Sequence, residues 1–133
     1  MEDKRRSFRI GDVVKHFKYN DLTNEEKLEN KYLYKITGTC IHSETKEKMM
    51  LYQALYDPYE TYARPYDMFM SEVDKEKYPN ARQLYRFEIL DFVESHKAMD
   101  RCKITERKID LLLDNDNRYN PSVQLNNTPS TTN

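Results

Sequence analysis

The chain has 133 residues and nearly balanced charge, with 22 Lys and Arg against 23 Asp and Glu. This length allows one modest hydrophobic core, and the charge balance lacks the basic excess of avid nucleic-acid binders. No apolar run is long enough to span a membrane, so we expect no membrane partner. Cys40 and Cys102 lie far apart, which predicts reduced thiols, no disulfide and a cytoplasmic location.

The first part of the chain is predicted to hold a leader, a strand and a short helix. Residues 1–10 are basic and polar and are expected to be a flexible leader. A first strand is expected over residues 13–18, which are rich in valine and aromatic side chains. Thr23 and Glu26 have the spacing of a capping box, so a short helix should begin there.

The middle of the chain predicts antiparallel strands. Residues 32–42 alternate with the period of two that a half-buried strand requires, and Gly38 within them predicts a bulge. A polar turn follows, and residues 49–56 are expected to form the partner strand. Residues 61–64 predict another short strand, which ends at Pro65 because proline cannot donate to a ladder.

The remaining segments complete a mainly β domain. A single helical turn is expected over residues 65–70, and the last strand over residues 85–89. Short strands separated by frequent turns indicate a small barrel or sandwich. Residues 91–114 are expected to form a helical extension, and residues 115–133, rich in Asn, Ser, Thr and Pro, a disordered tail.

Seven short segments occur in an order and spacing typical of one known family: Gly11, 16–18, 42–45, 52–56, Arg64-Pro65, Met68-Phe69 and Arg86-Phe87. Together they resemble the DUF1653 family, a bacterial and phage domain of unknown function. The resemblance covers about residues 11–89 and implies a compact SH3-like β-roll. This chain departs from the family at residues 19–31, which lengthen the first connection, and beyond Leu90. Because the family has no established activity, the resemblance implies a fold and no mechanism.

The sequence supplies no recognisable catalytic or metal-binding motif. His42-Ser43-Glu44-Thr45 could suggest acid–base chemistry, but four polar residues between strands are more simply a turn. The histidines and cysteines lack the paired spacing of a zinc site, and two glycines are too few for a phosphate-cradling loop. We therefore expect no metal, no cofactor and no catalytic residue.

Aromatic side chains and one arginine gather between the last turns of the predicted sheet. They are Tyr52, Tyr56, Tyr59, Tyr62, Arg64, Tyr66 and Phe69. Arginine stacks on rings and forks onto carboxylate or phosphate, while tyrosine offers a ring and a hydroxyl. Tyr62 and Arg64 share strand parity and should face the same side. Alternatively the rings fill the core, and Arg64 pairs with Glu44, Glu60 or Asp67.

The leading hypothesis is a small non-enzymatic binding module with an aromatic and arginine rim. Its ligand would be a protein segment or an anionic small molecule. The ligand-binding candidates are His42, Glu44, Tyr52, Tyr56, Tyr62, Arg64 and Phe69. Two alternatives remain open: association with single-stranded nucleic acid, which the charge balance disfavours, and a nucleotide-handling protein or enzyme with a site around His42, Glu44 and Arg64.

Overall fold

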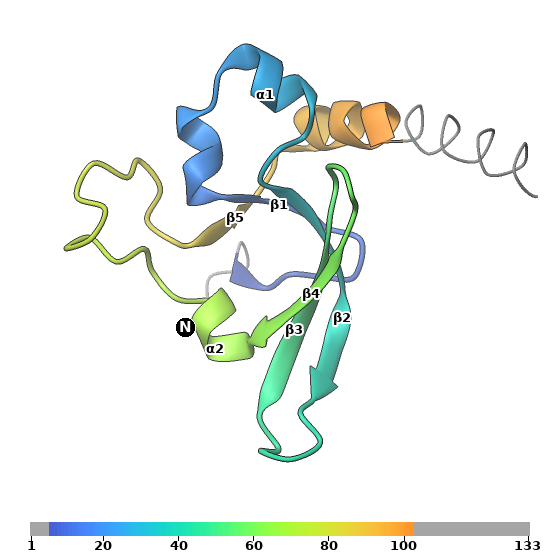
Figure 1. Ribbon diagram of the computed structural model, residues 1–133, viewed down its shortest axis with the longest axis vertical. Helices are drawn as coiled ribbons and strands as arrows, with labels where there is room; N and C mark the ends of the chain where they lie inside the picture. Colours follow the sequence, from blue (N-terminus) through green and yellow to red (C-terminus); the bar gives the residue numbers. More distant parts are fainter. Residues whose placement is uncertain (1–5, 103–133) are drawn as a thin grey trace, which may run out of the picture. The chain divides into compact units, whose positions relative to one another are not determined.

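Five strands form one antiparallel sheet in a computed structural model that describes residues 6–102 (Figure 1). They are β1 (Val13–His16), β2 (Leu33–Ile41), β3 (Lys48–Ala54), β4 (Thr61–Pro65) and β5 (Phe87–Ile89). The strand order is β4-β3-β2-β1-β5, so the first four strands follow one another and the last returns to pair with β1. The predicted mainly β fold is confirmed.

Three short helical segments occupy connections between strands: η2 (Phe17–Asp21), α1 (Asn24–Leu28) and α2 (Tyr66–Phe69). A further helix over residues 92–102 follows β5. The predicted capping box is present, because the Thr23 hydroxyl accepts from the Glu26 amide and the Glu26 carboxylate accepts from the Thr23 amide. The predicted helical turn after β4 also forms, with Pro65 at its N-cap.

The predicted bulge lies in β2, beside Gly38. Ile36 pairs with Tyr52 and Gly38 pairs with Leu51, which leaves Thr37 without a partner residue in β3. Gly38 has a φ of +153°, a conformation that favours glycine because it has no Cβ. An extra residue on one strand bends the ladder and increases its twist. The bulge therefore helps β2 and β3 to curve.

The core lies on one face of the sheet and is largely aromatic. Its buried members are Val14, Tyr34, Ile36, Met50, Tyr52, Ala54, Phe69 and Phe87. The Phe69 and Phe87 rings stack with centroids 4.0 Å apart and planes within 7°. Phe69 comes from α2 and Phe87 from β5, so this stack joins the segments that follow β4 to the far edge of the sheet.

Residues near the N-terminus also pack against the sheet. The Arg6 guanidinium donates to the carbonyl oxygens of Met70 and Phe87, at 2.7 Å each, and lies 3.8 Å from the centre of the Tyr85 ring. Phe8 packs edge-on against Phe69. Two side chains of the segment expected to be a flexible leader therefore contact the β domain.

The chain divides into two compact units, one ending at Met99 and one beginning at Asp100. Of the expected helical extension, residues 92–102 are helical, and 103–114 lie outside the described residues. The expected tail over residues 115–133 also lies outside them. Among the described residues, no helix has both the length and the apolar character needed to cross a membrane.

Candidate functional site

A groove lies between β4, the end of β1 with η2, and the connection that precedes β5. It consists of two adjoining pockets that share His16, Lys18 and Arg64. The cation pocket, of about 310 Å³, is lined by His16, Phe17, Lys18, Arg64, Asp74, Lys77, Tyr78 and Arg86. The tyrosine pocket, of about 190 Å³, is lined by His16, Lys18, Tyr32, Tyr34, Tyr52, Tyr56, Tyr62, Arg64 and Phe87.

Strand parity explains why these side chains meet. Tyr52 pairs with Tyr62 across β3 and β4, and His16 pairs with Phe87 across β1 and β5. Side chains at directly paired positions lie on the same face of a sheet. Arg64 lies two residues beyond Tyr62 and so shares that face, as the sequence predicts. The groove is therefore the exposed continuation of the aromatic core.

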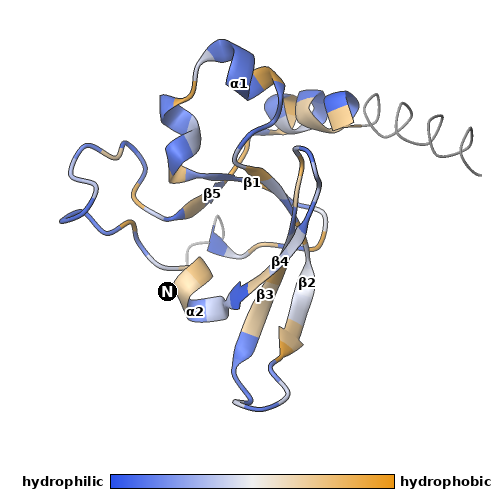
Figure 2. Ribbon diagram, viewed as in Figure 1, coloured by the Kyte–Doolittle hydropathy of each residue, from blue (hydrophilic) through white to orange (hydrophobic). Residues whose placement is uncertain are grey.

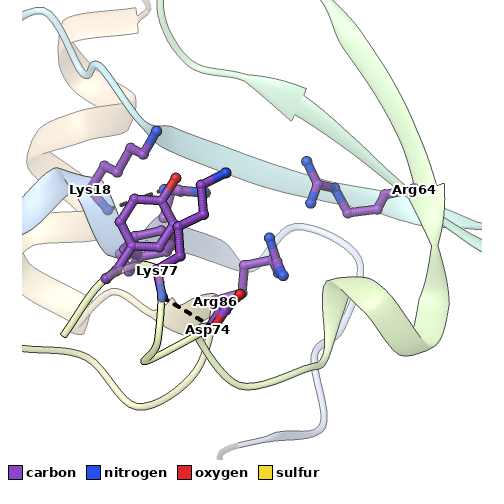
Figure 3. A pocket seen from close by; sticks show the side chains of 8 residues that line it. Lys18, Arg64, Asp74, Lys77 and Arg86 are labelled. Carbon is purple, nitrogen blue, oxygen red and sulfur yellow. Dashed lines mark hydrogen bonds between the residues drawn. The ribbon is translucent and has the colours of Figure 1, made fainter. Parts of the chain in front are cut away.

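Four cationic side chains surround the cation pocket. Figure 3 shows Arg64 reaching in from β4, while Lys18, Lys77 and Arg86 approach from the other side. Within residues 6–102, none of the four lies within 4.0 Å of a carboxylate oxygen. The alternative that Arg64 pairs with a nearby acid therefore has no support. The cation pocket carries an excess of positive charge.

Neutral hydroxyl groups hold the two arginines. The Arg64 Nε donates to the Tyr52 hydroxyl at 3.2 Å, and the Arg86 Nε donates to the Ser71 hydroxyl at 3.4 Å. Both bonds use the nitrogen nearest the side-chain stem. The terminal nitrogens of both forks have no hydrogen-bond partner among the described residues. Each guanidinium is therefore oriented by its Nε bond, and its two terminal nitrogens can still donate to the two oxygens of an oxyanion.

The two lysines and the one acid of the cation pocket are also positioned. The ammonium groups of Lys18 and Lys77 each lie 5.5 Å from the centre of the Tyr78 ring, a cation–π arrangement. The Asp74 carboxylate accepts hydrogen bonds from the amides of Glu76 and Lys77, and these bonds stabilise the turn that Asp74 begins. The hydrogen bonds of Asp74 are therefore made within its own turn.

His16 lies where the two pockets join. Its Nδ1 accepts from the Lys18 amide at 3.1 Å, and its ring stacks on Phe17 at 4.3 Å. Burial, reinforced by the charges of Lys18, Arg64 and Arg86, lowers the pKa of His16 to about 4. The imidazole is therefore neutral at pH 7, and because Nδ1 is an acceptor, its proton is on Nε2.

The tyrosine pocket is a set of aromatic rings that includes one hydroxyl–hydroxyl pair. Tyr34 and Tyr56 share a hydroxyl–hydroxyl hydrogen bond of 2.7 Å. Burial raises the pKa of both phenols, and for Tyr34 the bond to Tyr56 raises it further. The Tyr52 and Tyr62 rings lie 5.7 Å apart, and Tyr62 is 40% exposed. The raised pKa values keep the Tyr34 and Tyr56 phenols protonated, so these two groups do not repel an anion.

The structure gathers four of the seven predicted site residues in the groove: Tyr52, Tyr56, Tyr62 and Arg64. Phe69 is 0% exposed and stacks on Phe87, so it supports the groove without reaching a ligand. Its ring is covered because α2 packs it onto Phe87 of β5.

The turn between β2 and β3 is mostly hydrophilic (Figure 2). His42 and Glu44 lie in this turn, at the tip of the hairpin, and line neither pocket. The His42 Nδ1 accepts from the amides of Glu44 and Thr45, as expected of a turn. His42, Glu44 and Arg64 therefore share no pocket here, and the enzyme alternative built on them gains no support.

Sequence reasoning did not select the other half of the groove, namely His16, Lys18, Lys77 and Arg86. These residues come from segments far apart in the chain and belong to no motif of fixed spacing. A partial signal existed, because 16–18 and Arg86-Phe87 are among the segments that carry the resemblance stated above. The pairing of β1 with β5 brings 16–18 beside Arg86-Phe87.

Comparison with protein-family models matches residues 12–89 to the family described as "Protein of unknown function (DUF1653)". The matched range is more than half of the chain. The chain belongs to the DUF1653 family. Every residue that lines the groove lies within the part that matches DUF1653. Searches of curated proteins and of solved structures found no match.

Proposed function

We propose that this protein is a small binding module whose groove takes an anionic ligand. The observation that carries the proposal is the gathering of Lys18, Arg64, Lys77 and Arg86 on one pocket. No carboxylate among the described residues pairs with them. Like charges repel, so this arrangement costs free energy until an anion lies among them.

The arginines favour an oxyanion as the bound group. Their Nε bonds to Tyr52 and Ser71 fix the guanidinium planes, and the terminal nitrogens remain available to a ligand. A guanidinium fork matches the two oxygens of a carboxylate or phosphate and binds them together. A ligand with such a group would meet Arg64 from β4 and Arg86 from the opposite wall (Figure 3).

The groove side chains favour binding over chemistry. The Nδ1 of His16 and the carboxylate of Asp74 already accept backbone amide hydrogens. The pKa values of Tyr34 and Tyr56 are raised, which keeps their hydroxyls protonated. A His16 Nδ1 that already accepts the Lys18 amide and phenols that stay protonated are poor general bases or nucleophiles near neutral pH. A non-enzymatic role therefore fits this groove best.

Titration calorimetry of the full chain with inorganic pyrophosphate tests the proposal. We expect binding that weakens as salt increases, because charge supplies much of the attraction. Arg64→Ala and Arg86→Ala should each weaken binding about tenfold, which corresponds to ~1.4 kcal/mol. Arg82→Ala is the matched control, since Arg82 pairs with Asp21 outside the groove and carries the same charge.

Two results would overturn the proposal. One is failure of the wild-type protein to bind pyrophosphate, phosphate or sulfate at low salt. The other is an equal loss of affinity in Arg82→Ala and Arg64→Ala, which would show that the probe responds to net charge and not to the groove.

A further inference from the structure

The tyrosine pocket offers aromatic rings that a small inorganic anion would not contact. Five tyrosines and Phe87 line it, and it opens directly onto the cation pocket through His16, Lys18 and Arg64. An inorganic anion would fill the cation pocket and leave the rings unoccupied. The two adjoining pockets therefore suit a ligand with two different parts.

The rings favour a planar and polar group. Tyr62 at the mouth is 40% exposed, and its ring is tilted by 35° from that of Tyr52, with centroids 5.7 Å apart. Exposed aromatic faces stack on planar rings, and nucleobases are rings of this kind. The Tyr34 and Tyr56 hydroxyls add hydrogen-bonding groups inside the pocket. A purely aliphatic group would leave these hydroxyls unused.

The junction between the pockets is also polar. His16 presents a neutral ring there, with its Nδ1 committed to the Lys18 amide and its Nε2 carrying the proton. Arg64 touches both pockets, and its carbon Cζ lies 5.9 Å from the centre of the Phe87 ring. A polyhydroxylated linker between a ring and an anion would meet donors at this position.

We infer that the groove binds a nucleotide, with its phosphates among the four cations and its base against the tyrosines. The inference rests on the proposed function, because the phosphates use the same cation pocket. Four cations against Asp74 alone suit more than one phosphate group. One small aromatic pocket suits one base, whereas proteins that bind single strands stack successive bases along a basic groove.

Calorimetric titration of the full chain with nucleoside diphosphates tests the inference. The probes are ADP, GDP, CDP and UDP, with pyrophosphate and ribose 5-phosphate as ligands that lack a base. We expect at least one diphosphate to bind tenfold or more tightly than pyrophosphate. Tyr62→Ala should remove that advantage and leave pyrophosphate affinity unchanged, while Arg86→Ala should weaken both.

Phe92→Ala is the matched control for the loss of an aromatic ring. Phe92 is 76% exposed, lies on the helix over residues 92–102 and lines neither pocket, so its removal should change no affinity. An effect of Phe92→Ala equal to that of Tyr62→Ala would contradict the assignment of the base to the tyrosine pocket.

The remaining outcomes separate the inference from the proposed function. If pyrophosphate binds and the affinity of every nucleoside diphosphate is within twofold of that of pyrophosphate, the nucleotide inference is wrong and the anion-binding role stands. If a single-stranded oligonucleotide of ten nucleotides binds more tightly than any nucleoside diphosphate, the ligand is a single-stranded nucleic acid and the inference fails. If no anion binds at all, the proposed function fails with it.

Discussion

The groove and the tip of the β2–β3 hairpin contain similar residues in different surroundings. In both, the Nδ1 of a histidine accepts from backbone amides that follow it, His16 from Lys18 and His42 from Glu44 and Thr45. His42 is exposed to solvent, whereas His16 is packed among aromatic rings and three cations. The same local bond therefore closes a surface turn in one place and builds the wall of a pocket in the other.

Charged side chains interact more strongly in the groove than at the hairpin tip. Water solvates the hairpin tip, so its charges interact weakly and can be changed with little effect. The groove holds unpaired cations against a low-polarity aromatic wall, where charge is less screened. Substitutions that separate these two regions test the comparison directly.

The largest expected effect is on the core beneath the groove. Phe69→Ala should lower the free energy of unfolding by about 3–5 kcal/mol, because it removes a fully buried ring and its stack on Phe87. Ile41→Ala, at the hairpin and 60% exposed, should cost less than about 1 kcal/mol. Urea denaturation measures both. Equal losses would mean that Phe69 is not part of the core.

The second effect is a pH dependence that comes from His16 in the groove. The unfolded His16 takes up a proton near pH 6.5 and the folded one near pH 4, so acid favours unfolding in that window. The free energy of unfolding should fall by about 3 kcal/mol on this account between pH 7 and pH 4.

Substitution by asparagine isolates that contribution. His16→Asn keeps an acceptor for the Lys18 amide but does not titrate, so its stability should depend less on pH than that of the wild type. Denaturation at several pH values compares this variant with the wild type, and parallel curves for the two would contradict the environment assigned to His16.

The third effect is an asymmetry between the two bonded tyrosines. Tyr34 is 7% exposed, and Tyr56 is more exposed. Tyr56→Phe leaves the buried Tyr34 hydroxyl without its partner and should cost about 2 kcal/mol. Tyr34→Phe leaves a hydroxyl that water can reach and should cost about 1 kcal/mol or less. Thermal unfolding of both variants measures the difference, and the reverse order would disprove it.

The smallest effect is expected at the hairpin tip. His42→Ala removes two bonds to exposed amides and should lower the free energy of unfolding by about 0.5 kcal/mol. Its affinity for pyrophosphate should equal that of the wild type, because His42 lines neither pocket. Calorimetry checks this, and a tenfold loss of affinity would place the hairpin tip in the binding site.

The local features of this protein follow from its sequence. Alternation marks β2, the spacing of Thr23 and Glu26 marks the start of α1, and Gly38 marks the bulge. The shared face of Tyr62 and Arg64 follows from strand parity. Each of these depends on neighbours within a few residues, where backbone geometry fixes the outcome.

The composition of the groove follows only from tertiary structure. His16 and Arg86 are far apart in the chain, and the antiparallel pairing of β1 with β5 brings their segments together. Burial then decides that Phe69 supports the core while Tyr62 stays at the surface, although both are aromatic and close in sequence. Sequence spacing specifies which side of a strand a residue faces, but long-range packing specifies what it meets there.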